Sequence, residues 1–208
     1  MKEIANVRGY VLAGGASSRF GTDKALAEFA GQTMLARTAR LLSEATLPVK
    51  IVSSSAKLSG ESFETVPDLW PGEGPLGGIL TALSDAKKDG GEDTFALVVS
   101  CDMPFLTTDW LRFLAQRASA SGAEAIVPRS TQGWEPLCAC WRVSAAEIIL
   151  PSFEAGTRKV TDALNALHVE VLDERDWKRF DTNERLFWNM NTQADYEEAL
   201  RMLNPEKL

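Results

Sequence analysis

The sequence has few of the residues that build metal centres or disulfide frameworks. Its 208 residues include three cysteines and one histidine. Cys101, Cys138 and Cys140 form neither an even set nor a C-x-x-C zinc pattern. We therefore expect three reduced thiols, with Cys138 and Cys140 on the same face of one strand. His168 lies in an alternating pattern and is expected to be an exposed strand residue rather than a ligand or acid.

The sequence also lacks an excess of positive charge and a long apolar run. Its 22 Lys and Arg residues are outnumbered by 29 Asp and Glu, and the net charge of −7 argues against a general nucleic-acid surface. No apolar run approaches the roughly 18 residues that span a bilayer. The charged start at residues 1–8 does not resemble a signal peptide. We expect no nucleic acid, no membrane and a cytoplasmic location.

The remaining composition and patterning are those of an α/β domain. With 45% hydrophobic residues, the chain can bury a sizeable core as one domain, 1–208. Apolar strand patterns alternate with helical ones over residues 8–120, as in βαβ units joined by right-handed crossovers. We predict a Rossmann-like fold with three α/β/α layers, in which helices cover both faces of a mostly parallel twisted sheet.

Residues 10–24 contain the clearest chemical signal. The apolar run Tyr10–Ala13 reads as a buried strand that stops at Gly14-Gly15, where the backbone can approach a ligand closely. Bare backbone N–H groups together with Arg19 and Lys24 suit a polyphosphate, which needs directional donors and fixed positive charge. The alternative is a glycine turn that follows the strand for steric reasons alone.

Two common glycine motifs do not fit this stretch. The P-loop requires Gly-Lys-Ser/Thr, whereas Thr22 and Asp23 separate Gly21 from Lys24. The dinucleotide fingerprint requires G-x-G-x-x-G, which the glycine spacing here does not match.

Instead, three ordered segments resemble the signature of molybdenum cofactor guanylyltransferases and related MobA-like nucleotidyltransferases. They are Leu12-Ala13-Gly14-Gly15, then Ser17-x-Arg19-x-Gly21, then Asp23-Lys24-Ala25-Leu26. The resemblance implies a sheet of the nucleotide-diphospho-sugar transferase type. It also implies that Leu12, Ala13, Gly14, Gly15 and Lys24 bind GTP, with Arg19 and Lys24 in catalytic roles.

The strongest strand pattern, residues 94–100, leads to Asp102. A carboxylate at the carboxyl end of a central strand lies where open α/β sheets bind ligands. Mg²⁺ prefers one or two carboxylates plus substrate phosphates and waters. Asp102 is therefore our candidate metal ligand, GTP contact and catalytic residue. The alternative, a cap for the helix near Thr108, is weakened because Thr107 and Asp109 lie closer to that helix start.

Ser54 and Asp68 are the other candidate nucleotide contacts. Ser54 follows the strand 49–53 and either contacts the base or turns the chain. Asp68 opens a glycine-proline loop that runs to Gly78, after which we expect a helix over 79–88. An Asp followed by Gly-Pro-Leu-Gly-Gly resembles a second family signature, in which the aspartate helps bind the guanine nucleotide. A capping Asp in a surface loop is the alternative.

The half after about residue 121 is expected to hold the acceptor, and the half 8–120 the nucleotide. We predict one strand over 133–141 with Glu135 at the cleft mouth, and Trp134 either in the core, which is favoured, or stacked on a flat ring. Arg158 and Lys159 would lie in the first turn of a helix over 156–164. Because positive charge there opposes the helix dipole, they either bind a phosphate or form a solvated face.

The last candidate residues are Asn189 and Asn191. Their Asn-x-Asn-Thr context resembles the family's final motif, which lies beside triphosphate and metal. Thr192 and Asp195 also form a capping box for a helix through residue 203.

The resemblance implies transfer of GMP from GTP to molybdenum-molybdopterin with release of pyrophosphate, using Mg²⁺. Transient contacts with other cofactor-biosynthesis or recipient proteins are also expected. The alternatives are CTP as donor, a sugar phosphate or another pterin as acceptor, or a nucleotide-binding protein without turnover.

Overall fold

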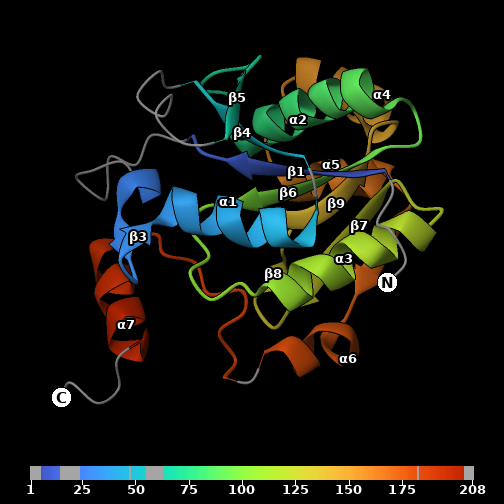
Figure 1. Cartoon of the computed structure of the whole chain (residues 1–208). Helices are drawn as coiled ribbons and strands as arrows, with labels where there is room; N and C mark the ends of the chain where they lie inside the picture. The colour runs from blue at the N-terminus through green and yellow to red at the C-terminus, as the bar shows by residue number, and fades with distance from the viewer. Residues whose placement is uncertain (1–5, 15–23, 47, 55–62, 182, 204–208) are drawn as a thin grey trace.

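The fold is built on one mixed sheet, seen in a computed structural model that describes residues 6–14, 24–46, 48–54, 63–181 and 183–203 (Figure 1). Within these ranges the sheet has eight strands in the order β10-β7-β9-β6-β1-β4-β5, with β8 paired to β7. The strands are β1 (Val7–Leu12), β4 (Val49–Ser53), β5 (Glu64–Pro67), β6 (Phe95–Ser100), β7 (Ala125–Ser130), β8 (Gly133–Trp134), β9 (Cys138–Arg142) and β10 (Val169–Leu172). A short antiparallel pair is formed by β2 (Glu28–Phe29) and β3 (Gln32–Thr33).

The strand directions confirm the mostly parallel Rossmann-like sheet. β1 is parallel to both β6 and β4, and β4 is parallel to β5. β9 runs antiparallel to β6 on one side and to β7 on the other. Because β9 lies between them, the strands before and after residue 120 share one sheet.

Helices cover both faces of the sheet (Figure 1). One face packs against α1 (Met34–Ala45) and α3 (Thr108–Ala120), and the other against α2 (Pro75–Gly90), α4 (Ala145–Glu154) and α5 (Val160–Ala163). Successive side chains of β6 point to opposite faces of the sheet, and both faces are apolar. Leu97 and Val99 pack on the side of α1 and α3, and Ala96 and Val98 pack on the side of α2, α4 and α5. The described part of the chain continues with α6 (Glu174–Trp177) and ends with α7 (Gln193–Leu203); 3-10 turns lie at Lys24–Leu26, Leu164–Ala166 and Lys178–Phe180.

A buried polar network holds α2 against the sheet. The Tyr10 hydroxyl donates to Asp85 (2.8 Å), and Lys50 Nζ lies 3.0 Å from Asp85 and 2.7 Å from Asp89. Burial, followed by the bond to Asp85, raises the pKa of Tyr10. Burial lowers the pKa of Lys50, but the hydrogen bonds to Asp89 and Asp85 outweigh it and leave that pKa raised. The network joins the second half of α2 to β1 and β4.

Three element boundaries differ from the sequence predictions. The helix expected over 79–88 begins at Pro75, with Gly74 as its N-cap, because proline loses nothing at a first helical position. The strand expected over 133–141 is two strands, β8 and β9, separated around Pro136, which has no N–H to donate. The helix expected over 156–164 starts only at Val160.

Other predictions from the sequence are confirmed. Cys138 and Cys140 are free, buried and packed in the same core cluster. His168 is exposed as predicted, but it lies immediately before β10 and not within a strand. Trp134 is partly buried and packs against the core. As a finding separate from these predictions, no helix in the described part of the chain is long and apolar enough to cross a membrane.

Candidate active site

A cavity of about 490 Å³ opens at the carboxyl ends of β1, β4 and β6, beside the first turn of α2. We call it the cleft. It brings together five residues that the sequence singled out, namely Leu12, Gly14, Ser54, Asp68 and Asp102. The remaining wall is formed by Val52, Gly72, Gly74, Pro75, Gly78, Ser100 and Leu137. Five segments far apart in sequence therefore meet at one edge of the sheet, as expected for a ligand site of this fold.

The glycine segment after β1 is only partly described. Ala13 is buried, and its N–H donates to the carbonyl of Val52 (3.0 Å), which ties the end of β1 to β4 beside the cleft. Gly14 lines the cleft, and among the described residues no atom beyond its chain neighbours lies within 4 Å of the position a Cβ would take. Gly15 and Arg19 lie outside the described residues. Lys24 begins a 3-10 turn, but its side chain is outside the description as well.

Asp68 is held rigidly at the cleft by its own loop and by α2. Its Oδ1 accepts hydrogen bonds from the Trp70 N–H (3.0 Å) and from the Thr81 hydroxyl (3.0 Å). The same Thr81 hydroxyl accepts from the Leu69 N–H (3.1 Å). The described hydrogen bonds of this carboxylate all go to Oδ1, so Oδ2 can accept from a ligand without breaking one of them.

The first turn of α2 closes the cleft with almost no side chain. Gly74, its N-cap, has φ 81° and ψ −175°, a conformation that only glycine adopts readily. A Cβ on Gly78 would approach the Leu12 side chain to 3.3 Å, so glycine also allows the helix to pack on β1. The N-terminus of a helix carries partial positive charge and unsatisfied N–H groups. This end of the cleft therefore suits an anionic or hydrogen-bond-accepting ligand.

Asp102 lies on the opposite side of the cleft, close to Glu135. Asp102 is half-buried after β6, whereas Glu135 is 7% exposed and accepts a hydrogen bond from the Ser130 hydroxyl (2.6 Å). Burial raises the pKa of Glu135, and the negative charge of Asp102 raises it further, against the opposing effect of Ser130. The two carboxylates are thus near enough for the charge of Asp102 to disfavour ionisation of Glu135, and a cation bound nearby would relieve this repulsion.

This donor set fits Mg²⁺. No group of three or more His, Cys, Asp or Glu side chains gathers into a metal cage within the described ranges. Magnesium commonly uses one or two carboxylates and takes its other ligands from phosphates and waters. Asp102, with Glu135 beside it, supplies that number of carboxylates.

The C-terminal asparagines lie beside Asp102. The backbone N–H of Met190 donates to the carbonyl of Asp102 (2.9 Å), which places Asn189 and Asn191 on either side of this contact. Asn189 is half-buried and its amide donates to the Phe187 carbonyl (3.0 Å). The capping box after Asn191 is confirmed, because Thr192 and Asp195 exchange side-chain to backbone bonds of 2.8 and 3.2 Å.

Comparison with known proteins agrees with this arrangement. The model of the MobA-like NTP transferase domain matches residues 9–171. The chain belongs to this family. It is 34% identical over 193 residues to a probable molybdenum cofactor guanylyltransferase of Pelotomaculum thermopropionicum, covering 92% of this chain and 90% of the relative. It is 29% identical over 192 residues to the molybdenum cofactor guanylyltransferase of Syntrophotalea carbinolica, covering 92% and 89%.

A solved structure has the same fold. Molybdopterin-guanine dinucleotide biosynthesis protein A from Archaeoglobus fulgidus superposes with a TM-score of 0.82 at 26% identity, covering 95% of this chain and 99% of that one. The MobA-like family consists of nucleotidyltransferases, so this chain is an enzyme of that class.

Two predicted site residues of this MobA-like enzyme lie elsewhere. Arg158 and Lys159 are exposed and precede α5, so the prediction that they occupy a helical first turn is wrong. Arg158 pairs with Glu73 in the glycine-proline loop, donates to the Phe153 carbonyl (2.5 Å) and lies over the Phe153 ring. Neither residue is among those that line the cleft in the described structure, and the same holds for Asn189, Asn191 and Glu135, the last of which is buried instead of standing at the cleft mouth. Arg158 thus links the loop to the end of α4.

Sequence reasoning missed several residues of the site. Thr81 was overlooked, although a threonine within the apolar stretch of α2 is itself a signal of a buried hydrogen bond. Ser130 donates to Glu135, but nothing in the sequence around it indicates this bond, because Ser130 ends β7 and Glu135 lies beyond the next turn and β8. The sequence places Gly74 within the glycine-proline loop, whereas in the structure it is the N-cap of α2.

Proposed function

We propose that this nucleotidyltransferase moves GMP from GTP to the terminal phosphate of molybdopterin carrying molybdenum, and releases pyrophosphate. The observation that carries the proposal is the meeting of Asp68 and Asp102 on opposite sides of one cleft whose floor is glycine backbone. The names of the relatives described above support the choice of GTP and of a molybdopterin acceptor.

In this proposal, Asp68 and the first turn of α2 bind the guanosine part of GTP. Asp68 Oδ2 accepts from N–H donors of the base, while Oδ1 keeps its bonds to Trp70 and Thr81. Gly14, Gly15 and the basic residues Arg19 and Lys24 neutralise the triphosphate. Leu12 and Ser54 complete the wall that orients the nucleotide.

Asp102 and Glu135, with Asn191 beside them, would hold Mg²⁺. When bound, the metal ion supplies positive charge for the phosphate oxygens as the bond to pyrophosphate breaks. The protein's own part is to align the acceptor phosphate with the α-phosphate of GTP. No general base is required, because the attacking phosphate is already ionised.

A panel of nucleotides tests the choice of donor. In the presence of Mg²⁺, the melting temperature should rise more with GTP than with ATP, CTP or UTP, because a ligand bound only by the folded state stabilises it by mass action. The largest shift with CTP would replace this proposal by a cytidylyltransferase. No shift with any of the four nucleotides would remove the nucleotide site altogether.

Asp102→Asn tests the metal role. The substitution keeps the shape of the side chain and removes the charge, so magnesium-dependent turnover should fall at least about a hundredfold, or roughly 2.7 kcal/mol in the barrier. Asp93→Asn is the matched control, because Asp93 is exposed just before the opposite end of β6. Near-normal pyrophosphate release by Asp102→Asn at saturating Mg²⁺ would show that the metal is held elsewhere.

A further inference from the structure

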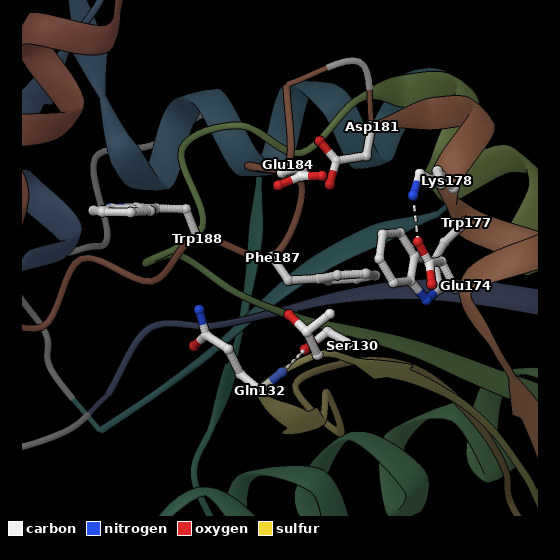
Figure 2. A pocket seen from close by; sticks show the side chains of 10 residues that line it. Ser130, Gln132, Glu174, Trp177, Lys178, Asp181, Glu184, Phe187 and Trp188 are labelled. Atoms are coloured by element: carbon white, nitrogen blue, oxygen red, sulfur yellow. Dashed lines mark hydrogen bonds and ion pairs between the residues drawn. The ribbon is translucent and has the colours of Figure 1, made fainter.

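A second cavity lies on the acceptor side of the molecule, outside the cleft. It has a volume of about 110 Å³ and lies between the turn that joins β7 to β8 and the segment 174–188. We call it the side pocket. Its lining residues are Ser130, Thr131, Gln132, Glu174, Trp177, Lys178, Asp181, Glu184, Phe187 and Trp188. Figure 2 shows Ser130 and Gln132 on one side, Asp181 and Glu184 on the other, and the ring of Phe187 between them.

Two connections link the side pocket to the catalytic end of the cleft. On one wall, Ser130 donates to Glu135, whose pKa is raised in part by the charge of Asp102. On the other wall, Trp188 is two residues before Met190, whose N–H bonds the Asp102 carbonyl. A ligand in the side pocket would therefore lie on the Asp102 side of the cleft, opposite the Asp68 side.

The floor of the side pocket is flat, aromatic and rigid. Phe187 is 7% exposed, and its ring packs edge-on against Trp110 (5.7 Å, 87°) and Trp177 (5.5 Å, 83°). The Trp177 indole N–H is used in a hydrogen bond to the Arg129 carbonyl (3.1 Å), which fixes that ring. Trp188 adds a half-buried ring at the edge. Such a floor suits a planar ring system.

The polar rim determines which planar ring the side pocket would accept. Three carboxylates line it, from Glu174, Asp181 and Glu184, against one cation, Lys178, which pairs with Glu174. This excess of negative charge disfavours a phosphate. It favours a neutral ring that presents several N–H donors, because carboxylates accept hydrogen bonds and do not donate them. The Gln132 amide can both donate and accept at the opposite wall.

We propose that the side pocket binds the aminopyrimidinone end of the acceptor's pterin, an inference that rests on the proposed function. The amino group and ring N–H would donate to Glu184 or Asp181, and the ring would lie against Phe187 and Trp188. Its phosphate end then extends past Glu135 toward Asp102. The acceptor and the nucleotide thus approach the reacting phosphates from opposite sides, as in-line transfer requires.

The test uses 6-hydroxymethylpterin as the probe, because it has the ring and lacks the phosphate and the metal. Its affinity for the full chain is measured by calorimetry for the wild type, Glu184→Gln and Gln132→Ala. Both positions are exposed, so both variants should fold. Asp162→Asn, on the exposed surface of α5, is the matched control. GTP binding with Mg²⁺ is measured for the same proteins.

We expect both variants to bind the pterin at least about tenfold more weakly, as for loss of a hydrogen bond to a charged or polar group, and GTP affinity to stay unchanged. No pterin binding by the wild type, or equal binding by all the proteins, would overturn the proposal. An equal loss of GTP and pterin affinity in these variants would also overturn it. Guanine contains the same aminopyrimidinone ring as the pterin, so this result would mean that the guanine of GTP occupies the side pocket. Because GTP is scored separately, failure of the pterin arm leaves the nucleotide site standing.

Discussion

Thr81 offers a direct test of how the cleft is held in shape. Its hydroxyl, in a residue that is 1% exposed, accepts from the Leu69 N–H (3.1 Å) and lies 3.0 Å from both Asp68 Oδ1 and the Gly77 carbonyl. Thr81→Val keeps the volume and removes these bonds. The Leu69 N–H loses a partner, and Asp68 Oδ1 retains only the bond from Trp70.

The expected loss follows from these contacts. Each hydrogen bond contributes about 0.5–1.5 kcal/mol net, and the substitution removes both the bond from Leu69 and the bond to Asp68, so the free energy of unfolding should fall by about 1–3 kcal/mol. For a chain of this length, about 1 kcal/mol lowers the melting temperature by roughly 2–4 °C, which predicts a drop of about 2–12 °C. Urea unfolding monitored by tryptophan fluorescence measures the change. GTP affinity should fall as well, because Asp68 is less firmly held.

Thr94→Val is the matched control for this experiment. Thr94 is also fully buried, but its hydroxyl has no hydrogen-bond partner among the residues that the structure describes. Replacing a hydroxyl that makes no bond by a methyl group should be neutral or stabilising. If Thr81→Val and Thr94→Val had equal stability and equal GTP affinity, the hydrogen bonds of Thr81 would not support the cleft, and the reasoning would be refuted.

Two further predictions concern Glu135, which lies near Asp102, and Gly74 in the wall of the cleft. The raised pKa of Glu135 favours its protonated form in the folded state, so the stability that this form contributes is lost as the pH rises through that pKa. Glu135→Gln should therefore unfold at a higher urea concentration than the wild type at pH 8, and the difference should shrink toward pH 4. A difference that does not depend on pH would contradict this. Gly74→Ala forces an alanine to φ 81°, so the variant should lose about 1–3 kcal/mol of unfolding free energy and bind GTP more weakly. Gly122→Ala is the control and should change neither, because a Cβ there meets nothing within 4 Å among the described residues. Equal melting temperatures for the two variants would show that position 74 tolerates a side chain without strain.

The parts of the fold that depend on local pattern were predictable. Asp102 follows a strand whose six residues are all buried, as its continuous apolar run indicates. α1 begins directly after Thr33, whose hydroxyl accepts from the Ala36 N–H (3.1 Å), and the capping box at Thr192 is formed as its residues imply. In each case neighbours along the chain supply the deciding interaction.

The errors arise where contacts distant in sequence decide the structure. Gly77 and Gly78 look like loop residues, yet they lie in the first turn of α2, where a Cβ would crowd Trp70 and Leu12 respectively. Arg158 looks like a phosphate ligand in the sequence, because its partner Glu73 lies 85 residues earlier and the local pattern does not reveal the pairing. Local patterns contain no information about such contacts.

The candidate site divides in the same way. Leu12 ends a strand, and Gly14, Ser54, Asp68 and Asp102 each follow one, so the rule that ligands bind at the carboxyl ends of parallel strands was enough to group them. The acceptor side follows no such rule. There an antiparallel strand, β9, enters the sheet, and the walls come from the β7–β8 turn and a segment about 50 residues later.

The charge of the molecule explains why binding should be ordered. Asp102 and the buried Glu135 oppose each other at the end of the cleft, and the side pocket adds three more carboxylates. An acceptor phosphate that approached this region alone would meet a net negative charge, because Lys178 is outnumbered by the carboxylates. Once GTP and the proposed magnesium ion occupy the cleft, the charge of the two carboxylates is offset and the phosphate can approach. We therefore expect the nucleotide to bind first, with pterin-phosphate affinity rising when Mg²⁺ and a non-hydrolysable GTP analogue are present, while the affinity of the phosphate-free pterin stays unchanged.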